Sequence, residues 1–409
     1  MQGEIRPGYK QTELGVIPED WDAAQLEDLA DRLTVGFVGS MSHLFRKAGV
    51  PLLRGQDVRP GDLDFTGTKF ISEETHKRWN KSALSAGDVV IVRVGYPGTA
   101  AVVPNHIKTA NAASLLVLTP GREKLSSEFI CQVLNSEAGK KQIDSYLVGG
   151  AQQVVNTRVM AHFVFASPPL AEQRAIATAL ADADALIAAL EGMIAKKRDL
   201  KQAAMQHLLT GKTRLPGFSG EWEVKRLGEV AAIRNHKINT FGADAAAFCV
   251  ELEQVGQNTG QIDGHSDARS RRSVKYLFQK GDVLFGRLRP YLRKFWWANR
   301  DGVCSTEIWP LIPIGDRLVS GFLFQTIQTD AFIEAANSSY GTHMPRSDWK
   351  ALTKFEFNLP TDPNEQTAIA EVLSDMDADL AALEAQAAKA RAVKQGVMQE
   401  LLTGKVRLV

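Results

Sequence analysis

Residues 172–191 read EQRAIATALADADALIAALE, and residues 365–384 read EQTAIAEVLSDMDADLAALE. The two stretches align at an offset of 193 residues, and the alignment runs without a gap from Glu172–Leu215 to Glu365–Leu408. Within it 27 of 44 pairs are identical, and the identities include Glu-Gln, Lys-Gln, Met-Gln and Leu-Leu-Thr-Gly-Lys. Drift in an alanine-rich sequence does not produce matches at so many polar positions. The chain therefore contains an internal duplication.

The apolar residues of both copies are spaced four and three residues apart. They are Ile176, Leu180, Ala183, Ile187, Leu190 and Ile194 in the first copy, and Ile369, Leu373, Met376, Leu380, Leu383 and Ala387 in the second. This spacing is typical of the a and d positions of a coiled coil. We expect two helices of about 38 residues, each roughly 57 Å long. The simplest arrangement buries the two seams against each other, and the alternative packs each helix separately on its own domain.

Capping residues mark the ends of these helices. Asp362, Pro363 and Glu365 predict an N-cap, a first helical residue and a capping box for the second helix. The first copy follows "PPLAEQ" and lacks such a cap. Gly211 and Gly404 stand where a left-handed glycine ends a helix.

Similar lead-in segments precede two longer regions. Trp21 matches Trp222 and Leu26 matches Leu227, and the regions that follow contain the related strand-like stretches AGDVVIVRVG and KGDVLFGRLR. The regions otherwise diverge, so one scaffold presents two different surfaces. The order of segments is circular, which predicts an approximate two-fold relation and antiparallel long helices.

The predicted fold class is α+β, with two globular mixed α/β domains joined by two long helices that form an antiparallel coiled coil. The predicted segments are 1–167 (N-terminal segment and first domain), 168–215 (first long helix), 216–360 (second domain) and 361–409 (second long helix).

Composition limits the classes of function. The chain has 409 residues, is 44% hydrophobic, and carries a formal net charge of +1, so no global field favours nucleic acid or membrane. Its three cysteines lie far apart, which fits a reducing cytosol better than a disulfide framework. No segment reads as a signal peptide or a bilayer helix, so we expect a cytoplasmic protein.

A one-sided run of charge marks the second domain. Between Arg269 and Lys294 nine residues are basic and only Asp282 is acidic, with aromatic residues interleaved. Such a pattern suits phosphate contact and base reading, although a solvated charged face is the alternative. The candidate DNA-contact residues of this run are Arg269, Arg271, Arg272, Lys275, Tyr276, Arg287, Arg289, Arg293 and Lys294.

Weaker candidates lie elsewhere in both domains. In the first domain they are Lys77, Arg78, Lys81 and Arg93. Matching segments before each long helix add Gln152 and Gln153, and Thr342, His343 and Arg346, which could address base edges or simply form turns.

Motifs for catalysis and cofactor binding are absent from the sequence. We find no phosphate-binding loop, no dinucleotide-binding GxGxxG, no HExxH, and no [DN]PP[YF] methyltransferase motif. The histidines are scattered singly, so no metal site and no catalytic residue is predicted.

Five stretches resemble the specificity (S) subunits of type I restriction–modification systems: YKQTELGVIPEDW, KGDVLFGRLRPY, CSTEIWPL, EQRAIATAL and LLTGKTRL. The resemblance spans essentially the whole chain. It departs in the first domain, where ANAASLLVL (110–118) stands for the CSTEIWPL form. The resemblance implies a non-catalytic DNA-recognition subunit with two target-recognition domains, each reading one half of an asymmetric bipartite site.

The resemblance also implies partners. The long helices would act as a spacer between half-sites and dock two methyltransferase (M) subunits, and restriction (R) subunits would join through the complex. S-adenosylmethionine, ATP and Mg are expected on those partners only, and no cofactor on this chain. Candidate partner-binding residues on the helices are Glu172, Gln173, Ile176, Leu180, Leu208, Leu209, Glu365, Gln366, Ile369, Leu373, Leu401 and Leu402.

Three other functions stay open from the sequence. A specificity subunit of a type IIB-like or methylation-only system would differ only in its partners. A self-sufficient pseudo-dimeric nuclease or methyltransferase would need an active site that sequence alone does not reveal. An assembly scaffold would bind protein through its variable domains.

Overall fold

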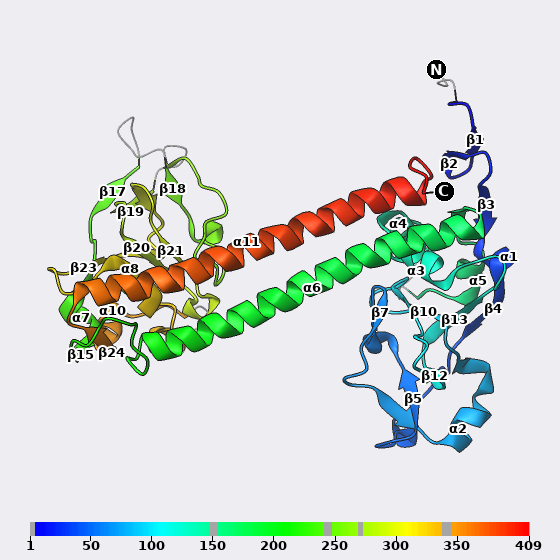
Figure 1. Cartoon of the computed structure of the whole chain (residues 1–409), viewed down its shortest axis with the longest axis horizontal. Helices are drawn as coiled ribbons and strands as arrows, with labels where there is room; N and C mark the ends of the chain where they lie inside the picture. Colours follow the sequence, from blue (N-terminus) through cyan, green and yellow to red (C-terminus); the bar gives the residue numbers. More distant parts are fainter. Residues whose placement is uncertain (1–4, 148–153, 241–247, 269–272, 338–344, 409) are drawn as a thin grey trace. The chain divides into compact units, whose positions relative to one another are not determined.

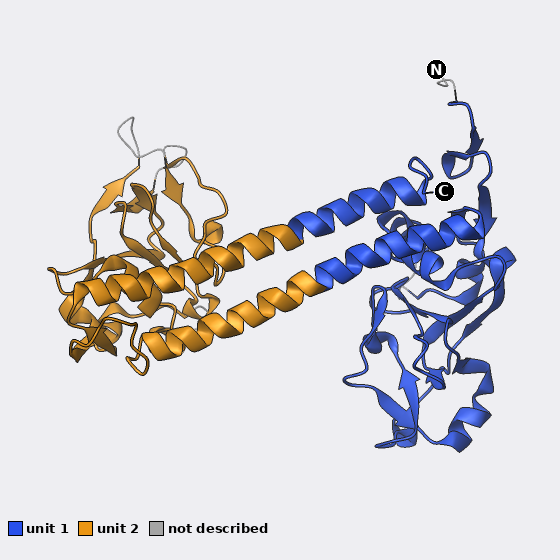
Figure 2. Cartoon of the chain, in the orientation of Figure 1, with its two compact units in different colours: residues 1–188, 388–409 blue, residues 189–387 orange. Residues whose placement is uncertain are grey.

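The computed structural model describes residues 5–147, 154–240, 248–268, 273–337 and 345–408 (Figure 1). The chain forms two compact units (Figure 2): residues 1–188 with 388–409, and residues 189–387. Each unit contains one mixed α/β domain and parts of both long helices, α6 (Leu170–Leu208) and α11 (Pro363–Leu402). The predicted α+β class with two long helices is confirmed, whereas the four segment boundaries remain predictions.

The first unit is built on two four-stranded sheets. One sheet is antiparallel with the order β11-β10-β13-β4, and the other has the order β8-β5-β12-β9 with a parallel β5–β12 pair. The strands are β1 Tyr9–Thr12, β2 Gly15–Pro18, β3 Asp22–Gln25, β4 Ala30–Val35, β5 Val50–Leu53, β6 Val58–Arg59, β7 Asp62–Leu63, β8 Lys69–Ile71, β9 Ala83–Leu84, β10 Val89–Val92, β11 Ala100–Val102, β12 Ala110–Ala112, β13 Leu115–Pro120 and β14 Val164–Ser167. The short helices are α1 Leu26–Leu29, α2 Glu73–Arg78, α3 Ser127–Asn135, α4 Glu137–Ser145 and α5 Thr157–Ala161.

The second unit repeats much of this arrangement. Its antiparallel sheet has the order β16-β23-β20-β21, and its other sheet, β17-β19-β22-β18, again contains one parallel pair, β18 with β22. The strands are β15 Trp222–Arg226, β16 Ala231–Ile233, β17 Lys237–Asn239, β18 Cys249–Val250, β19 Val274–Phe278, β20 Val283–Gly286, β21 Phe295–Trp297, β22 Gly302–Cys304, β23 Ile308–Pro313 and β24 Glu356–Pro360. The short helices are α7 Leu227–Val230, α8 Ser320–Thr326, α9 Asp330–Ala336 and α10 Trp349–Leu352.

Strand β10 shows why its sheet is buried on both faces. Val89 and Ile91 pack into a cluster with α3 and α6, whereas Val90 and Val92 pack into a second cluster with the neighbouring sheet. Successive side chains of a strand point to opposite faces, so a run of four apolar residues suits a central, covered strand. This is the strand that the AGDVVIVRVG stretch predicted.

The long helices have 39 and 40 residues, close to the predicted length. Gly211 and Gly404 have φ values of +73° and +69°, so the predicted left-handed C-caps are confirmed. Asp362 caps α11, because its Oδ1 accepts the backbone N–H of Asn364 at 2.9 Å.

Each predicted seam divides between two environments. Ile176 and Leu180 lie in the core of the first domain, and Ile369 and Leu373 lie in the core of the second. Farther along the helices the apolar residues of α6 and α11 pack against each other, namely Ile194, Leu380 and Ala387 with Leu190 and Leu383. Both arrangements considered from the sequence therefore occur, at different places along one seam.

In the second unit, ion pairs show that α6 and α11 run antiparallel. In the second unit Lys201 contacts Asp377 at 2.5 Å and Arg198 contacts Glu384 at 2.5 Å. In the first unit Lys394 Nζ donates to Asp184 at 2.6 Å. From Arg198 to Lys201 along α6, the partner moves back along α11 from Glu384 to Asp377, which is the antiparallel order.

A cluster of a buried glutamate, a half-buried arginine and a tryptophan, which we call a clasp, occurs in each unit. In the first unit Glu172 accepts hydrogen bonds from Arg407 at 2.6 and 2.7 Å and from the indole of Trp21 at 3.0 Å. Arg407 also pairs with Asp20 at 2.8 Å, and these carboxylates raise its pKa above the usual range. One clasp thus joins the lead-in segment, the start of α6 and the residues after α11.

The second unit has an equivalent clasp. Glu365 accepts from Arg214 at 2.5 and 2.6 Å and from the indole of Trp222 at 3.3 Å. The predicted capping box at Glu365 is therefore wrong, because its carboxylate is used by Arg214 and Trp222. Each clasp arginine follows a Leu-Leu-Thr-Gly-Lys phrase, which explains why the chain carries that phrase twice.

The neighbouring glutamines fix each helix start to its domain. Gln173 accepts the backbone N–H of Ser126 at 2.9 Å and donates to the carbonyls of Lys124 and Pro168. Gln366 makes the matching bonds to the N–H of Val319 and to two backbone carbonyls. Both glutamines are buried, so the Glu-Gln pair at the start of each copy stabilises the contact between the long helix and its domain.

We predict that Arg214→Ala lowers the free energy of unfolding by about 3–5 kcal/mol, because Glu365 would be left buried without its charged partner. Denaturant unfolding measures the change. Arg226→Ala is the matched control, since its pair with Glu356 is exposed and should contribute under about 1 kcal/mol. Equal losses in the two variants would contradict a stabilising clasp.

Candidate nucleic-acid interface

The basic run of the second domain occupies β19, β20, β21 and their connections. Seven of the candidate residues lie outside the described residues: Arg269, Arg271, Arg272, Thr342, His343, Gln152 and Gln153. The others can be placed, and the fold uses many of them internally.

Lys275 and Tyr276 on β19 are buried, with 8% and 7% of their surface exposed. The ammonium of Lys275 pairs with Glu251, and Lys237 lies 5.0 Å from the centre of the Tyr276 ring. The structure therefore corrects the prediction that these two residues contact DNA, because neither offers a free surface.

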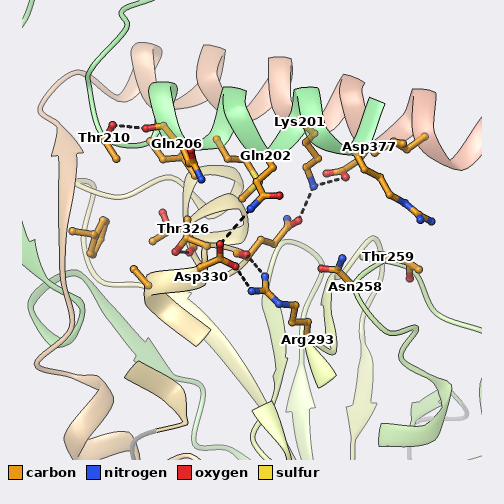
Figure 3. Close-up of a pocket in the computed structure, with 18 of the residues that line it drawn as sticks. Lys201, Gln202, Gln206, Thr210, Asn258, Thr259, Arg293, Thr326, Asp330 and Asp377 are labelled. Carbon is orange, nitrogen blue, oxygen red and sulfur yellow. Dashed lines mark hydrogen bonds and ion pairs between the residues drawn. The ribbon is translucent and has the colours of Figure 1, made fainter. Parts of the chain in front are cut away.

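Arg293 and Lys294 also bond within the domain. Arg293 pairs with Asp330 and donates to the carbonyl of Gln328 at 3.0 Å, and Figure 3 shows Arg293 beside Asp330. Lys294 Nζ donates to the carbonyl of Leu252 at 2.8 Å. Both side chains are half-buried and bonded within the domain, so they help to hold the hairpin, and their contact with DNA stays a prediction.

The hairpin between β20 and β21 contains the remaining arginines of the run. The guanidinium carbon of Arg287 lies 4.9 Å from the centre of the Trp309 ring, while its Nε is buried and has no hydrogen-bond partner among the described residues. Arg289 is exposed, and no ion pair or side-chain hydrogen bond joins it to another described residue. Arg346 is exposed and bonded to Glu307, which raises the pKa of Arg346.

The weaker candidates of the first domain are mostly exposed. Lys77, Arg78 and Lys81 lie on or just after α2, and Arg78 pairs with Glu74 at 2.9 Å in an exposed ion pair. Arg93 follows β10 and donates from Nε to the carbonyl of Val155 at 3.1 Å. Lys77 and Lys81 are thus free to meet phosphate, whereas Arg93 is partly used by the fold.

One exposed aromatic residue was missed from the sequence. Tyr96, in the β10–β11 hairpin, is 84% exposed. The signal was available in the alignment, because Gly-Tyr-Pro-Gly (95–98) in the first domain stands opposite Arg-Pro-Tyr (289–291) in the second.

The proposed partner-binding residues of the helices need correction. All except Leu402 are buried, with at most 7% of their surface exposed: Glu172, Gln173, Ile176, Leu180, Leu208, Leu209, Glu365, Gln366, Ile369, Leu373 and Leu401. They fill the domain cores or form the clasps. A docking partner would have to contact other faces of α6 and α11.

Each unit has a pocket between a long helix and the domain. In the second unit it has a volume of about 720 Å³ and contains the Lys201–Asp377 ion pair and the Gln202–Asp330 hydrogen bond (Figure 3). In the first unit the pocket has a volume of about 510 Å³. The 193-residue offset relates five helix residues of the two linings: Gln202, Met205, Gln206, Leu209 and Thr210 match Gln395, Met398, Gln399, Leu402 and Thr403. We call these the paired grooves.

Metal ions and membranes find no matching feature in the part of the chain that the structure describes. No group of three or more His, Cys, Asp or Glu side chains in the described ranges could hold a metal ion. No helix in the same ranges is long and apolar enough to cross a membrane.

Two mixed α/β domains, a clasp in each unit and a related hairpin in each domain define a duplicated fold. The profile of the type I restriction modification DNA specificity domain matches residues 18–197 and again residues 219–390. The chain belongs to this family, and it contains two copies of the domain.

Named relatives and solved structures agree with this family. The chain is similar to the MjaX specificity subunit of Methanocaldococcus jannaschii, with 24% identity over 98% of this chain and 97% of the relative. It is also similar to the EcoDI specificity subunit of Escherichia coli, with 27% identity over 51% and 45% of the two chains. The S subunit structure from M. genitalium matches at a TM-score of 0.61 and 14% identity, covering 93% of this chain and 96% of that one. A structure of a type I R-M system, described by its complex assembly and conformational transition, matches at a TM-score of 0.54 and 16% sequence identity. The match covers 95% of this chain and 99% of that one.

Proposed function

We propose that this chain is the DNA sequence-specificity subunit of a type I restriction–modification complex. Each domain reads one half of a bipartite DNA site, and the long helices set the gap between the halves. The observation that carries this proposal is the presence of two specificity domains with different exposed residues in one chain. Because the two domains differ, the two half-sites differ as well.

The chain itself contributes binding and no catalysis in this proposal. Exposed lysines such as Lys77 and Lys81 contact phosphates and give an affinity that falls with salt. Side chains near the hairpins contact base edges, where a good bidentate contact discriminates by about 1–3 kcal/mol. Methyl transfer with S-adenosylmethionine, and ATP- and Mg-dependent restriction, are carried out by the partner subunits.

The first prediction concerns the methylated sequence. In a host that expresses this chain with its methyltransferase partner, methylome sequencing should reveal one asymmetric, bipartite motif. A continuous or palindromic motif would contradict the reading by two unlike domains. The purified chain alone should neither cleave DNA nor transfer methyl groups, which separates this function from a pseudo-dimeric enzyme. A type IIB-like or methylation-only system would give the same motif with different partner subunits.

The second prediction tests the helices as a spacer. Deletion of residues 186–192 from α6 and 386–392 from α11 keeps the Lys201–Asp377 and Lys394–Asp184 ion pairs and the heptad phase. The rods become shorter by about 10 Å at about 1.5 Å per residue. We expect the gap in the methylated motif to shrink by roughly three base pairs at ~3.4 Å each. The half-site sequences should stay the same, and an unchanged gap would argue against a spacer role.

The paired grooves offer two equivalent positions for the methyltransferase subunits. The same five helix residues line both grooves, although the domains around them diverge. A pair of matching sites in one chain suits two copies of one partner. Half-buried Met205 supplies apolar surface, and exposed Gln206 supplies hydrogen bonds at the rim. Methyltransferase docking in the paired grooves would also explain why the buried helix residues are not needed for contact.

The third prediction concerns stoichiometry. Gln206→Arg and Gln399→Arg place a bulky charge at the rim of one groove each, at exposed positions that should not disturb folding. Each single variant should retain one methyltransferase subunit in place of two, and the double variant none, as measured by mass photometry. His207→Arg is the control, because His207 is exposed on the same helix turn but lies outside the groove. Two bound subunits in the double variant would rule out the grooves.

A further inference from the structure

The hairpins β10–β11 and β20–β21 occupy equivalent places in the two domains. In each domain the first strand of the hairpin lies at the centre of the antiparallel sheet, between the second strand of the hairpin and β13 or β23. Arg93 and Arg287 directly follow β10 and β20. The two connecting loops, 93–99 and 287–294, can therefore be compared, although the second is one residue longer.

Both loops expose a tyrosine. Tyr96 is 84% exposed and its neighbour Val94 is 55% exposed, while Tyr291 is 51% exposed. The central strands β10 and β20 beneath these loops are buried at every residue, so the aromatic side chains stand on a rigid base. Covering an exposed aromatic ring with a partner lowers the free energy of the complex. Exposed loop tips on rigid strands are typical of binding sites.

The backbone of the two loops reaches left-handed conformations with different residues. The first domain uses Gly95 and Gly98, with φ values of +90° and +84°. The second domain uses Arg289 and Arg293, with φ values of +52° and +50°. Left-handed φ values are disfavoured for residues with a Cβ atom, and such strain persists where a side chain has a role.

The two strained arginines differ in their contacts. Arg293 pairs with Asp330 and donates to the carbonyl of Gln328, so contacts within the fold explain why an arginine stands there. The exposed side chain of Arg289 has no such partner among the described residues. Glycine would fit position 289 with less strain, so the guanidinium is the feature that an arginine adds there.

We propose that the two hairpin tips are the matching DNA-contacting elements of the domains, with Tyr96 and Tyr291 packing against bases of their respective half-sites and Arg289 donating hydrogen bonds to the duplex. This inference rests on the proposed function and adds the residues that read each half. Tyrosine suits the role because its flat ring stacks on or wedges beside any base and its hydroxyl can meet a base edge. The guanidinium of Arg289 suits guanine or phosphate acceptors.

The test uses the complete complex of this chain with its methyltransferase partner. Tyr96→Ala and Tyr291→Ala are each compared with the wild type on a duplex carrying both half-sites. Each substitution should weaken binding about tenfold, the effect of losing one base–aromatic contact. Each should also relax the methylated motif in one half-site, and the two variants should relax opposite halves. Tyr146→Ala is the control, because Tyr146 is also exposed, at 42%, but lies at the end of α4.

Arg289→Gly separates a DNA role from a structural role. The variant relieves the left-handed strain, so its melting temperature should not fall below that of the wild type. Its affinity should nevertheless fall about tenfold, with the loss confined to the half-site that Tyr291→Ala affects.

Two results would overturn the inference. One is wild-type affinity and an unchanged motif in both tyrosine variants, and the other is relaxation of the same half-site by both. In either case a bipartite wild-type motif would leave the proposed function intact. A wild-type complex that methylates no bipartite motif would instead contradict the proposed function itself.

Discussion

The structure depends on a buried carboxylate at the start of each long helix. Glu172 and Glu365 have no exposed surface, and an unpaired charge in such a place would strongly destabilise the fold. Arg407 and Arg214 supply the opposite charge from beyond the end of the other helix, and the two indoles complete the hydrogen bonds. The requirement to pair each glutamate therefore brings three distant segments together in each unit. The duplicated Leu-Leu-Thr-Gly-Lys stretch precedes each of these arginines in the sequence.

Regular local patterns made part of the fold predictable. The helix lengths, the glycine C-caps and strand β10 follow from periodicity and turn chemistry, which act over a few residues. The elements against which the apolar seam packs were harder to predict, because the spacing shows which helix face is apolar and not what covers that face. Ile176 and Ile194 share one seam, yet the first lies in a domain core and the second packs on α11. The Glu-Gln pairs were misassigned because buried charged residues are rare and resemble surface residues in sequence.

The candidate DNA residues show a similar limit. The run from Arg269 to Lys294 is basic in sequence, but Lys275 and Arg293 are neutralised by Glu251 and Asp330, which lie outside the run. Charge counted along a chain does not include partners that the fold brings from elsewhere. Arg289 and Lys280 are exceptions within the described part of the run, since both are exposed and neither side chain has such a partner among the described residues. Tyr96 was missed because a single tyrosine in a glycine turn has no charge pattern around it.

The division of the long helices between two cores bears on how the chain loses its structure. The first turns of α6 fill the core that contains Phe129, and its last turns fill the core that contains Phe285. α11 connects the same two cores in the reverse order. Melting of either domain would strip apolar cover from helices that the other domain also needs. The shared helices therefore couple the stabilities of the two cores more closely than an ordinary linker would.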